Sequence, residues 1–262
     1  MIDYSGRSAY YVNMMSFPNL KLAFFDIDGT LLRRDYDGTL SLKSRAFNHA
    51  VAAIFGVKSA DYTRILGKRL YGLTDKLILK TFLAELGIAE DSYYARENDL
   101  FLAIDDYFSQ NHNNSDTAGY YPLPGVLDFL KLLKADNIRL GLVTGNIRKH
   151  SLWKLEPAGL CDYFATGGFG DDAETRREIM SIAIGRNPDI DLDQICHFGD
   201  SPADLESARD CHIKAVAITD IGGGTHSREE LEAVGHGLVI DSWTALDKIA
   251  KYLLVGQDPP GS

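Results

Sequence analysis

Two carboxylates stand two positions apart in the segment Asp26-Ile27-Asp28-Gly29-Thr30, which follows a short apolar run. At the end of a strand this spacing lets both acids point into one crevice. Carboxylates that close repel each other unless a cation or a shared proton intervenes, and Mg²⁺ suits an oxygen-rich site. One acid held beside Mg²⁺ can attack a phosphoryl group, and the other can protonate the leaving oxygen. Taken alone, the segment also suits a solvated turn, which favours Asp and Gly.

Three further segments carry groups that suit a phosphoryl site. Thr144-Gly145-Asn146 offers a hydroxyl and small neighbours whose backbone N–H groups can face an anion. Gly199-Asp200-Ser201-Pro202-Ala203-Asp204 offers two more carboxylates. Between them the pair Arg176-Arg177 opens a helical pattern, and its charge can balance a phosphoryl oxygen and Asp26. Together these segments favour phosphoryl chemistry over a plain turn.

Short apolar runs ended by Gly, Asp or Thr predict the strands that must position these groups. The runs are residues 20–25, 138–143, 195–198, 215–218 and, more weakly, 238–240. Helical patterns lie between them, as at residues 126–133 and 202–208. Strands buried on both faces that alternate with helices predict an α/β fold, a Rossmann-like and mostly parallel sheet sandwiched by helices. Such folds bind ligands at the carboxyl ends of their strands.

The segment from residue 34 to residue 121 has a different pattern. It contains no convincing strand, and its helical stretches lie around residues 41–56, 74–87 and 91–111. An all-helical domain inserted after the first strand would lie above the carboxyl ends of the sheet. We therefore expect an N-terminal arm with the first part of the core in 1–33, a helical cap domain in 34–121 and the remainder of the core in 122–262.

Composition narrows the class of protein. Of 262 residues, 45% are hydrophobic, which excludes intrinsic disorder. The 27 basic against 37 acidic side chains give a net charge of −10, so we expect neither nucleic-acid nor membrane partners. Three scattered cysteines predict reduced thiols, not disulfides or zinc ligands. The sequence shows no signal-peptide pattern and no stretch of transmembrane length, so we expect a cytoplasmic protein.

The four motifs, in this order, resemble those of the haloacid dehalogenase superfamily. They are Asp26-x-Asp28-Gly29-Thr30, Thr144-Gly145-Asn146, Arg176 and Gly199-Asp200-x-x-x-Asp204, and the likeness runs from residue 20 to about 245. The resemblance implies a phosphohydrolase that uses Mg²⁺ and carries a helical cap after its first motif. It also implies a small phosphorylated metabolite as the substrate.

The resemblance implies a role for each motif residue that faces the substrate. Asp26 would be the nucleophile, and Asp28 the general acid and base, which also lends its backbone carbonyl to Mg²⁺. Thr144 would hydrogen-bond the transferring phosphoryl group, with Gly145 and Asn146 beside it in the substrate-binding loop.

The metal and the positive charge would be supplied by the later motifs. Asp200 would bind Mg²⁺, and Asp204 would support either the metal or the cationic residue. The family usually has lysine as this cation, and the chain has no lysine between Lys154 and Lys214, so Arg176 is our choice. Its neighbour Arg177 and, third, Lys154 stay open as alternatives.

Departures from the pattern select a branch. Asp28 argues against the dehalogenases, which lack that acid, and residues 33–39 lack the histidine of the phosphomutases. Phosphonate cleavage uses a cap lysine as a Schiff base; Lys43 is present, but nothing marks it as desolvated. We expect a phosphomonoesterase that resembles phosphoglycolate phosphatases. A phosphosugar mutase, a phosphonate hydrolase and a non-catalytic protein that binds a phosphometabolite remain alternatives.

Substrate selection is expected in the cap. The loop of residues 68–75 ends in Thr74, a predicted helix N-cap, and related enzymes turn the equivalent loop toward the active site. Arg69 and Tyr71 are therefore candidates to contact the distal end of the substrate, and an ordinary surface helix end is an equal alternative.

Other conspicuous residues are assigned to structure. We expect His197 to be a core histidine and Trp153 and Trp243 to be packing residues within helices. The glycine runs at 167–170 and 222–224 fit no nucleotide-binding motif and are interpreted as turns.

Overall fold

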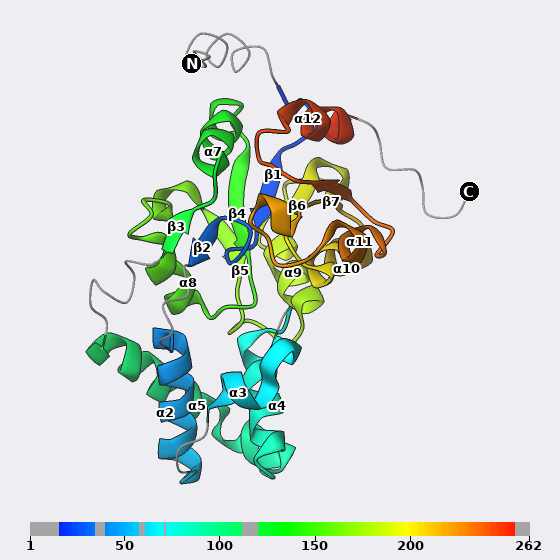
Figure 1. Cartoon of the computed structure of the whole chain (residues 1–262). Helices are drawn as coiled ribbons and strands as arrows, with labels where there is room; N and C mark the ends of the chain where they lie inside the picture. Colours follow the sequence, from blue (N-terminus) through cyan, green and yellow to red (C-terminus); the bar gives the residue numbers. More distant parts are fainter. Residues whose placement is uncertain (1–15, 35–39, 58–60, 71, 112–119, 255–262) are drawn as a thin grey trace, which may run out of the picture.

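A parallel sheet forms the centre of the molecule (Figure 1). The computed structural model describes residues 16–34, 40–57, 61–70, 72–111 and 120–254. Within these ranges the sheet has six strands in the order β5-β4-β1-β6-β7-β8, and all neighbours pair in parallel. Its strands are β1 (Leu22–Phe25), β4 (Arg139–Val143), β5 (Thr166–Gly168), β6 (Ile195–Gly199), β7 (Lys214–Ile218) and β8 (Leu238–Ile240). The predicted α/β, Rossmann-like fold is confirmed.

Helices cover both faces of this sheet. Side chains alternate along β1, so Ala23 and Phe25 face one apolar cluster while Leu22 and Phe24 face another. The first cluster includes residues of α7 and α12, and the second includes residues of α9, α10 and α11. The core helices are α7 (Val126–Ala135), α8 (Arg148–Leu155), α9 (Arg176–Gly185), α10 (Pro202–Asp210), α11 (Arg228–Glu232) and α12 (Leu246–Leu254). Short 3₁₀ turns are η2 (Cys161–Tyr163), η3 (Leu192–Gln194) and η4 (Asp220–Gly222).

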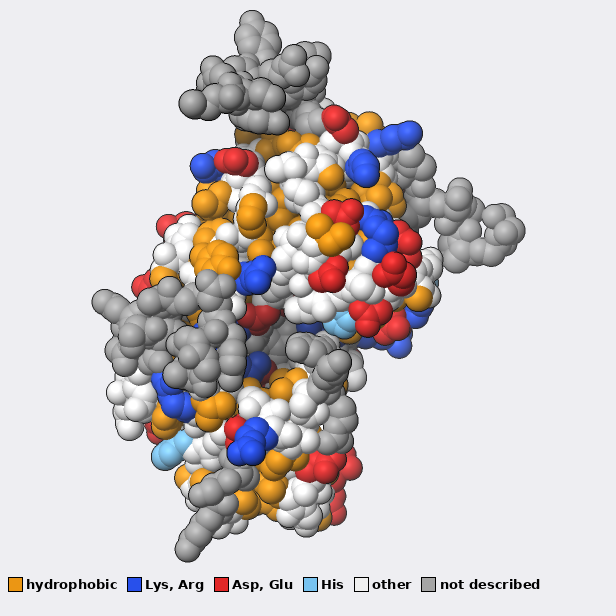
Figure 2. Space-filling model, in the orientation of Figure 1, with side chains coloured by type: hydrophobic (Ala, Val, Ile, Leu, Met, Phe, Trp, Pro, Cys, Tyr) orange, Lys and Arg blue, Asp and Glu red, His pale blue; other side chains and the backbone are white. Residues whose placement is uncertain are grey.

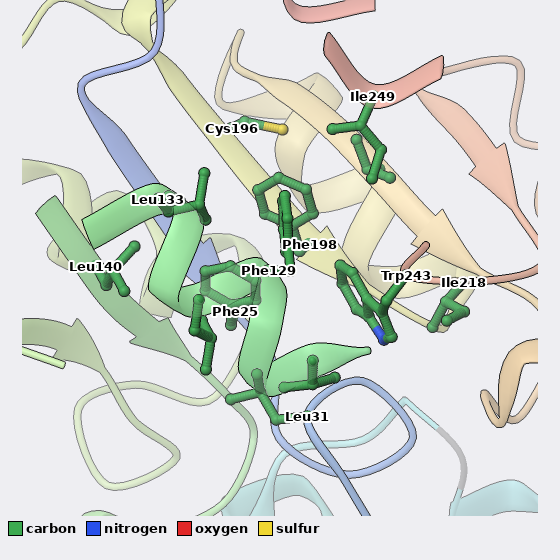
Figure 3. Close-up of a cluster of buried hydrophobic side chains, with 14 of the residues drawn as sticks. Phe25, Leu31, Phe129, Leu133, Leu140, Cys196, Phe198, Ile218, Trp243 and Ile249 are labelled. Carbon is green, nitrogen blue, oxygen red and sulfur yellow. The ribbon is translucent and has the colours of Figure 1, made fainter. Parts of the chain in front are cut away.

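A cluster of aromatic side chains packs against one face of the sheet (Figure 3). Phe25 of β1 stacks on Phe198 of β6 at 4.8 Å between ring centroids, and Phe129 stacks on Trp243 at 5.4 Å. Trp243 does pack, but its predicted helix is wrong, because it lies in the turn before α12. Its indole Nε1 donates to the carbonyl of Thr30 at 3.2 Å, which ties the first motif to the core.

The predicted turn at 167–170 is wrong in part, because Gly167 and Gly168 belong to β5. A Cβ on Gly167 would lie 2.6 Å from the carbonyl oxygen of Leu142, and one on Gly168 would overlap the backbone of Ile179 in α9. Glycine therefore lets this edge strand approach its neighbours closely, a role that propensity does not report.

Helices of residues 40–111 form a body beside the sheet, with its own apolar cluster (Figure 1). These are α2 (Leu42–Phe55), α3 (Tyr62–Leu66), η1 (Gly67–Leu70), α4 (Asp75–Glu85) and α5 (Glu90–Asn111). Thr74 caps α4 as predicted, because its hydroxyl accepts from the Leu77 N–H. An antiparallel pair, β2 (Leu32–Arg34) with β3 (Tyr120–Pro122), joins the two sides of the insertion, and the sequence did not predict it. The exact domain bounds stay a prediction.

Hydropathy along the described helices gives no candidate for a membrane span, since none combines sufficient length with sufficient apolar character.

Candidate active site

The carboxyl edge of the sheet brings the motif residues together. Asp26 directly follows β1, Thr144 follows β4, and Asp200 follows β6, the strands that are neighbours at the centre of the sheet. The backbone N–H of Asp26 donates to the carbonyl of Phe198 at 2.9 Å, so the hydrogen bonding between β1 and β6 extends to Asp26. Gly29 then turns the chain with a φ of +74°, a conformation that glycine adopts readily.

Arg176 connects two of the acids. Its NH1 lies 3.4 Å from Asp26 Oδ1 and 2.8 Å from Asp204 Oδ1, and all three side chains are buried. Arg176 is the first residue of α9, a position fixed by the capping box of Thr175 and Glu178. The structure therefore places Arg176 against the predicted nucleophile.

Arg177 is exposed, and Lys154 contacts a different acid, Asp28. Of the three candidate cations, only Arg176 lies beside Asp26, as the predicted cationic role requires.

Asp204 holds the arginine in place and is itself fully paired. Its Oδ2 accepts from the hydroxyl of Ser201 at 2.6 Å, and its Oδ1 contacts His197 Nε2 at 2.9 Å as well as the guanidinium. Burial opposes ionisation, but Arg176 and His197 outweigh it and lower the pKa of Asp204. The core histidine predicted at position 197 is buried, and one of its nitrogens supports this acid.

Asp200 is the second acid that lies close to Asp26. Its Oδ2 accepts from the N–H and the hydroxyl of Thr225, at 2.8 and 2.5 Å. Burial and the neighbouring charges of Asp204 and Asp26 raise the pKa of Asp200 well above its usual range. Burial likewise raises the pKa of Asp26, against the effect of Arg176. Burial is the larger cause of each shift, and the negative charge of the neighbouring acids adds to it.

This concentration of acids fits a divalent cation. One oxygen from each of Asp26, Asp200 and Asp204 can be chosen so that all lie within 4.8 Å of one another, and Asp26 Oδ1 accepts no hydrogen bond from the described residues. Carboxylate oxygens are the ligands that Mg²⁺ prefers. The side chain of Asp28 is not part of this group, and the backbone carbonyl of Asp28, which the sequence analysis assigned to Mg²⁺, stays a prediction.

Asp28 instead forms an ion pair with Lys154. The ammonium lies 2.8 and 2.6 Å from the two carboxylate oxygens, and Asn146 Nδ2 donates to the same group at 2.8 Å. Burial acts to raise the pKa of Asp28, but Lys154 outweighs it and lowers this pKa. Asp26 and Asp28 therefore have opposite pKa shifts although two positions separate them.

The predicted substrate-binding loop, Thr144-Gly145-Asn146, lies beside Asp28. Thr144 is buried, and its Oγ1 accepts from Asn146 at 3.0 Å, while Gly145 and Asn146 line the pocket. A Cβ on Gly145 would contact the backbone carbonyl of Leu73 at 2.9 Å, so glycine permits the helical insertion to lie directly over this loop.

The pocket is bounded by the sheet edge and the helical insertion. Its volume is about 200 Å³, and Figure 2 shows charged side chains in the hollow between the two bodies. Asp26, Asp28, Arg176 and Asp200 line one end. The helical insertion lines the other side with residues from α2, α3, η1, α4 and the segment between η1 and α4, namely Lys43, Tyr62, Leu70, Gly72, Leu73 and Ile78.

Two predicted cap contacts fall at the limit of what the structure describes. Tyr71 lies outside the described residues, and Arg69 belongs to η1 but its side chain is not described. Their neighbours Leu70 and Gly72 line the pocket, and the contacts of Arg69 and Tyr71 with a substrate stay a prediction.

Sequence reasoning missed Tyr62 and Thr225, and it named Lys43 only to discount it. Thr225 follows β7, a neighbour of β6, so its place after a strand of the same sheet could have found it. No comparable signal marks Lys43 and Tyr62.

A family model for haloacid dehalogenase-like hydrolases matches residues 23–218 of the chain. The chain belongs to this family. As a haloacid dehalogenase-like hydrolase it is an enzyme, and the resemblance stated from its motifs is confirmed. The match includes all four motifs and the helical insertion.

Curated relatives of this hydrolase carry phosphatase names. A phosphoglycolate phosphatase from Agrobacterium fabrum is 28% identical over 239 residues, which cover 89% of this chain and 93% of the relative. One from Rhodospirillum rubrum is 27% identical and covers 92% and 95%. A phosphorylated carbohydrates phosphatase from Thermotoga maritima is 24% identical and covers 82% and 90%.

Solved structures agree on the fold of this hydrolase. A predicted phosphatase from Clostridium acetobutylicum superposes with a TM-score of 0.62 at 20% identity, covering 90% of this chain and 98% of that one. A β-phosphoglucomutase from Clostridium difficile reaches 0.61 at 16% identity, covering 89% and 97%. At these identities the likeness concerns the fold alone.

Proposed function

We propose that this hydrolase is a Mg²⁺-dependent phosphatase that cleaves a small phosphate monoester through an aspartyl-phosphate on Asp26. One observation carries the proposal: a buried carboxylate faces both a guanidinium at 3.4 Å and two further acids, at one end of a small pocket. The phosphoglycolate phosphatase name of relatives that cover nine-tenths of the chain supports a phosphoglycolate-like substrate.

The proposed reaction divides the work between the two acids of the first motif. An oxygen of Asp26 attacks phosphorus, the phosphorus–oxygen bond of the ester breaks, and Asp28 gives a proton to the leaving oxygen. Asp28 then takes a proton from water as that water attacks the aspartyl-phosphate, which releases phosphate and restores Asp26. Since Lys154 favours the ionised form of Asp28, the acid must first gain a proton and leave the lysine.

Charge on the phosphoryl oxygens is the main obstacle for an acidic site. Arg176 supplies a fixed positive charge beside Asp26, and Thr144 with the N–H groups of its loop supplies dipoles. Asp26, Asp200 and the backbone carbonyl of Asp28 would hold Mg²⁺, with Asp204 supporting Arg176. The ion supplies the positive charge that lets the dianionic substrate approach these carboxylates.

Two of the alternatives, the phosphonate hydrolase and the protein that only binds, fit this site less well than a phosphatase. A Schiff base in a phosphonate hydrolase needs a neutral amine. Burial acts to lower the pKa of Lys43, but the carboxylate of Asp75 outweighs it and raises this pKa, so the amine stays protonated. A protein that only binds a phosphometabolite has no need of an acid such as Asp28 beside a nucleophile.

A panel of small phosphate esters tests the proposal. We expect phosphate release from carboxylated and sugar phosphates with Mg²⁺, and loss of release with excess EDTA. Equal release in EDTA would contradict the metal dependence. Isomerised sugar phosphate without free phosphate would establish a mutase instead, and tight ester binding without turnover would establish a binding protein.

A further inference from the structure

Lys43 presents an ammonium group to the pocket from the helical insertion, whereas Asp26 and Arg176 line it from the sheet edge. It lies on α2, and its side chain is 14% exposed. Its Nζ forms an ion pair with the buried Asp75 and donates to Asn146 Oδ1 at 3.1 Å. An ammonium has three protons, and these two contacts use two of them. The third is available to a ligand in the pocket.

A second ammonium meets the first at the same acceptor. Lys154 Nζ lies 3.2 Å from Asn146 Oδ1, the oxygen that Lys43 also contacts. Two like charges gathered on one amide oxygen repel each other. Lys43 pairs with Asp75 and Lys154 pairs with Asp28, and an anion bound in the pocket beside Lys43 would further offset the repulsion between the two lysines.

Tyr62 adds a neutral donor to this end. Its hydroxyl lies 3.4 Å from the hydroxyl of Ser44, the residue after Lys43, and it lines the same pocket. Among the described residues, the remaining side chains that line the pocket from the insertion are apolar, namely Leu70, Leu73 and Ile78. These described residues offer few polar partners for the several hydroxyls of a sugar, whereas one compact charged group can be satisfied by an ammonium and a phenol.

The cavity also limits length. Its volume of about 200 Å³ lies below the roughly 300–1,000 Å³ of pockets that hold drug-sized ligands. A phosphoryl group bound beside Asp26 would fill part of this volume, so only a short chain could join it to a group beside Lys43.

We propose that Lys43, with the Tyr62 hydroxyl beside it, binds a carboxylate at the distal end of the substrate. The enzyme then selects short phosphate monoesters of hydroxy acids over uncharged esters of the same size. This inference rests on the proposed phosphatase function and assigns the residue that determines its specificity.

Two esters of equal length test the assignment: 2-phosphoglycolate, which ends in a carboxylate, and 2-hydroxyethyl phosphate, which ends in a hydroxyl. Wild-type enzyme should prefer the carboxylate ester at least tenfold in kcat/KM. Lys43→Met should bring this ratio to about 1, since a charge-assisted hydrogen bond contributes roughly ten- to hundredfold. Lys76→Met is the matched control, because Lys76 is also a half-buried cap lysine in an ion pair, 16% exposed, and does not line the pocket. It should keep the wild-type ratio.

A double variant separates recognition from folding. Lys43→Met alone leaves Asp75 unpaired, so Lys43→Met with Asp75→Asn removes both charges and keeps an acceptor for the N–H of Ile147. The ratio should again be about 1. A ratio that stays at the wild-type value in both variants would overturn the assignment, as would wild-type enzyme that hydrolyses both esters equally. If wild-type enzyme released no phosphate from these two esters and none from the other members of the panel, the proposed function itself would be contradicted.

Discussion

The two ends of the pocket differ in how they handle charge. At the sheet edge, Asp26, Asp200 and Asp204 lie close together beside the Arg176 guanidinium, and burial, together with the neighbouring negative charges, raises the pKa of Asp26 and of Asp200. At the helical end, Lys43 is balanced by Asp75, and apart from the Tyr62 hydroxyl the described side chains that line it are apolar. The end with excess negative charge can bind a divalent cation and, with it, a phosphoryl group. The end where Asp75 balances the charge of Lys43 has one free N–H donor, which can distinguish between ligands.

This contrast separates two kinds of variant. Changes at the sheet edge should lower turnover of every ester and leave the ratio between carboxylated and neutral esters unchanged. Changes at Lys43 should alter that ratio. A sheet-edge variant that altered this ratio, or a Lys43 variant that lowered turnover of every ester equally, would contradict the difference between the two ends.

Replacement of Arg176 should have the largest effect among the supporting residues. Arg176→Met removes the positive charge 3.4 Å from Asp26, and we expect kcat to fall about a hundred- to thousandfold for both esters. Arg176→Lys should retain more activity, because it keeps the charge. Steady-state assays with the exposed Arg177→Met as control check this, together with melting curves, since loss of Arg176 also leaves buried Asp204 without its cation. Comparable losses in the Arg177 variant would reassign the cationic role.

Asp28→Asn should separate the two acids of the first motif. The variant cannot donate a proton, so alkyl phosphates should be cleaved about a hundredfold more slowly. An ester with an acidic alcohol, such as 4-nitrophenyl phosphate, needs no proton and should lose much less. Because Asp28 also acts as the base in the second step, which is common to both esters, the comparison uses kcat/KM, which reports formation of the aspartyl-phosphate. An equal loss of kcat/KM with both esters would contradict proton donation by Asp28.

Gly29→Ala tests the close approach between the first and last motifs. A Cβ there would overlap Asp200 Oδ2, so the acid must move, and we expect at least tenfold lower activity in Mg²⁺. Gly87→Ala is the matched control, since its φ of +75° equals the +74° of Gly29 within a degree, with nothing within 4 Å of the added Cβ. Both variants should lose about 1–2 kcal/mol from the backbone alone. Equal activities in the two variants would show that Asp200 tolerates displacement.

Lys154→Met should have the smallest effect, seen in the pH dependence of stability. The pKa of Asp28 is lower in the folded protein than its ordinary value, so the pair stabilises the fold above that ordinary value, about 3.9, and loses this contribution as the pH falls through the folded pKa. Because Asp28 is 46% exposed, the contribution should be at most about 1 kcal/mol. Melting temperatures from about pH 7 down to about pH 3 should fall less steeply in the variant. Parallel curves would contradict the pair.

The sheet edge was predictable because it depends on local sequence. Each acid follows a run of buried strand residues, and parallel strands end at one edge, so Asp26, Asp200 and Thr144 could be placed together. The choice of Arg176 also followed from its place at a helix start. Even here β5 was missed, since its glycines serve close packing.

The helical end depends on contacts between segments far apart in the chain. Lys154 ranked third for a role beside the nucleophile, and the structure pairs it with Asp28, 126 positions away. Asn146 joins Lys43 to this pair across 103 positions. Buried lysines on helices have no local pattern that reveals their partners, because tertiary packing decides them.

The central claim is that Asp26 forms a bond to phosphorus, and one measurement tests it directly. Wild-type enzyme and Asp26→Asn are mixed with a substrate ester and Mg²⁺, quenched in acid, and the peptide that contains residue 26 is examined by mass spectrometry beside released phosphate. We predict a phosphoryl group on Asp26 in the wild type, and neither modification nor phosphate release in the variant. Phosphate release by Asp26→Asn at the wild-type rate would contradict the account.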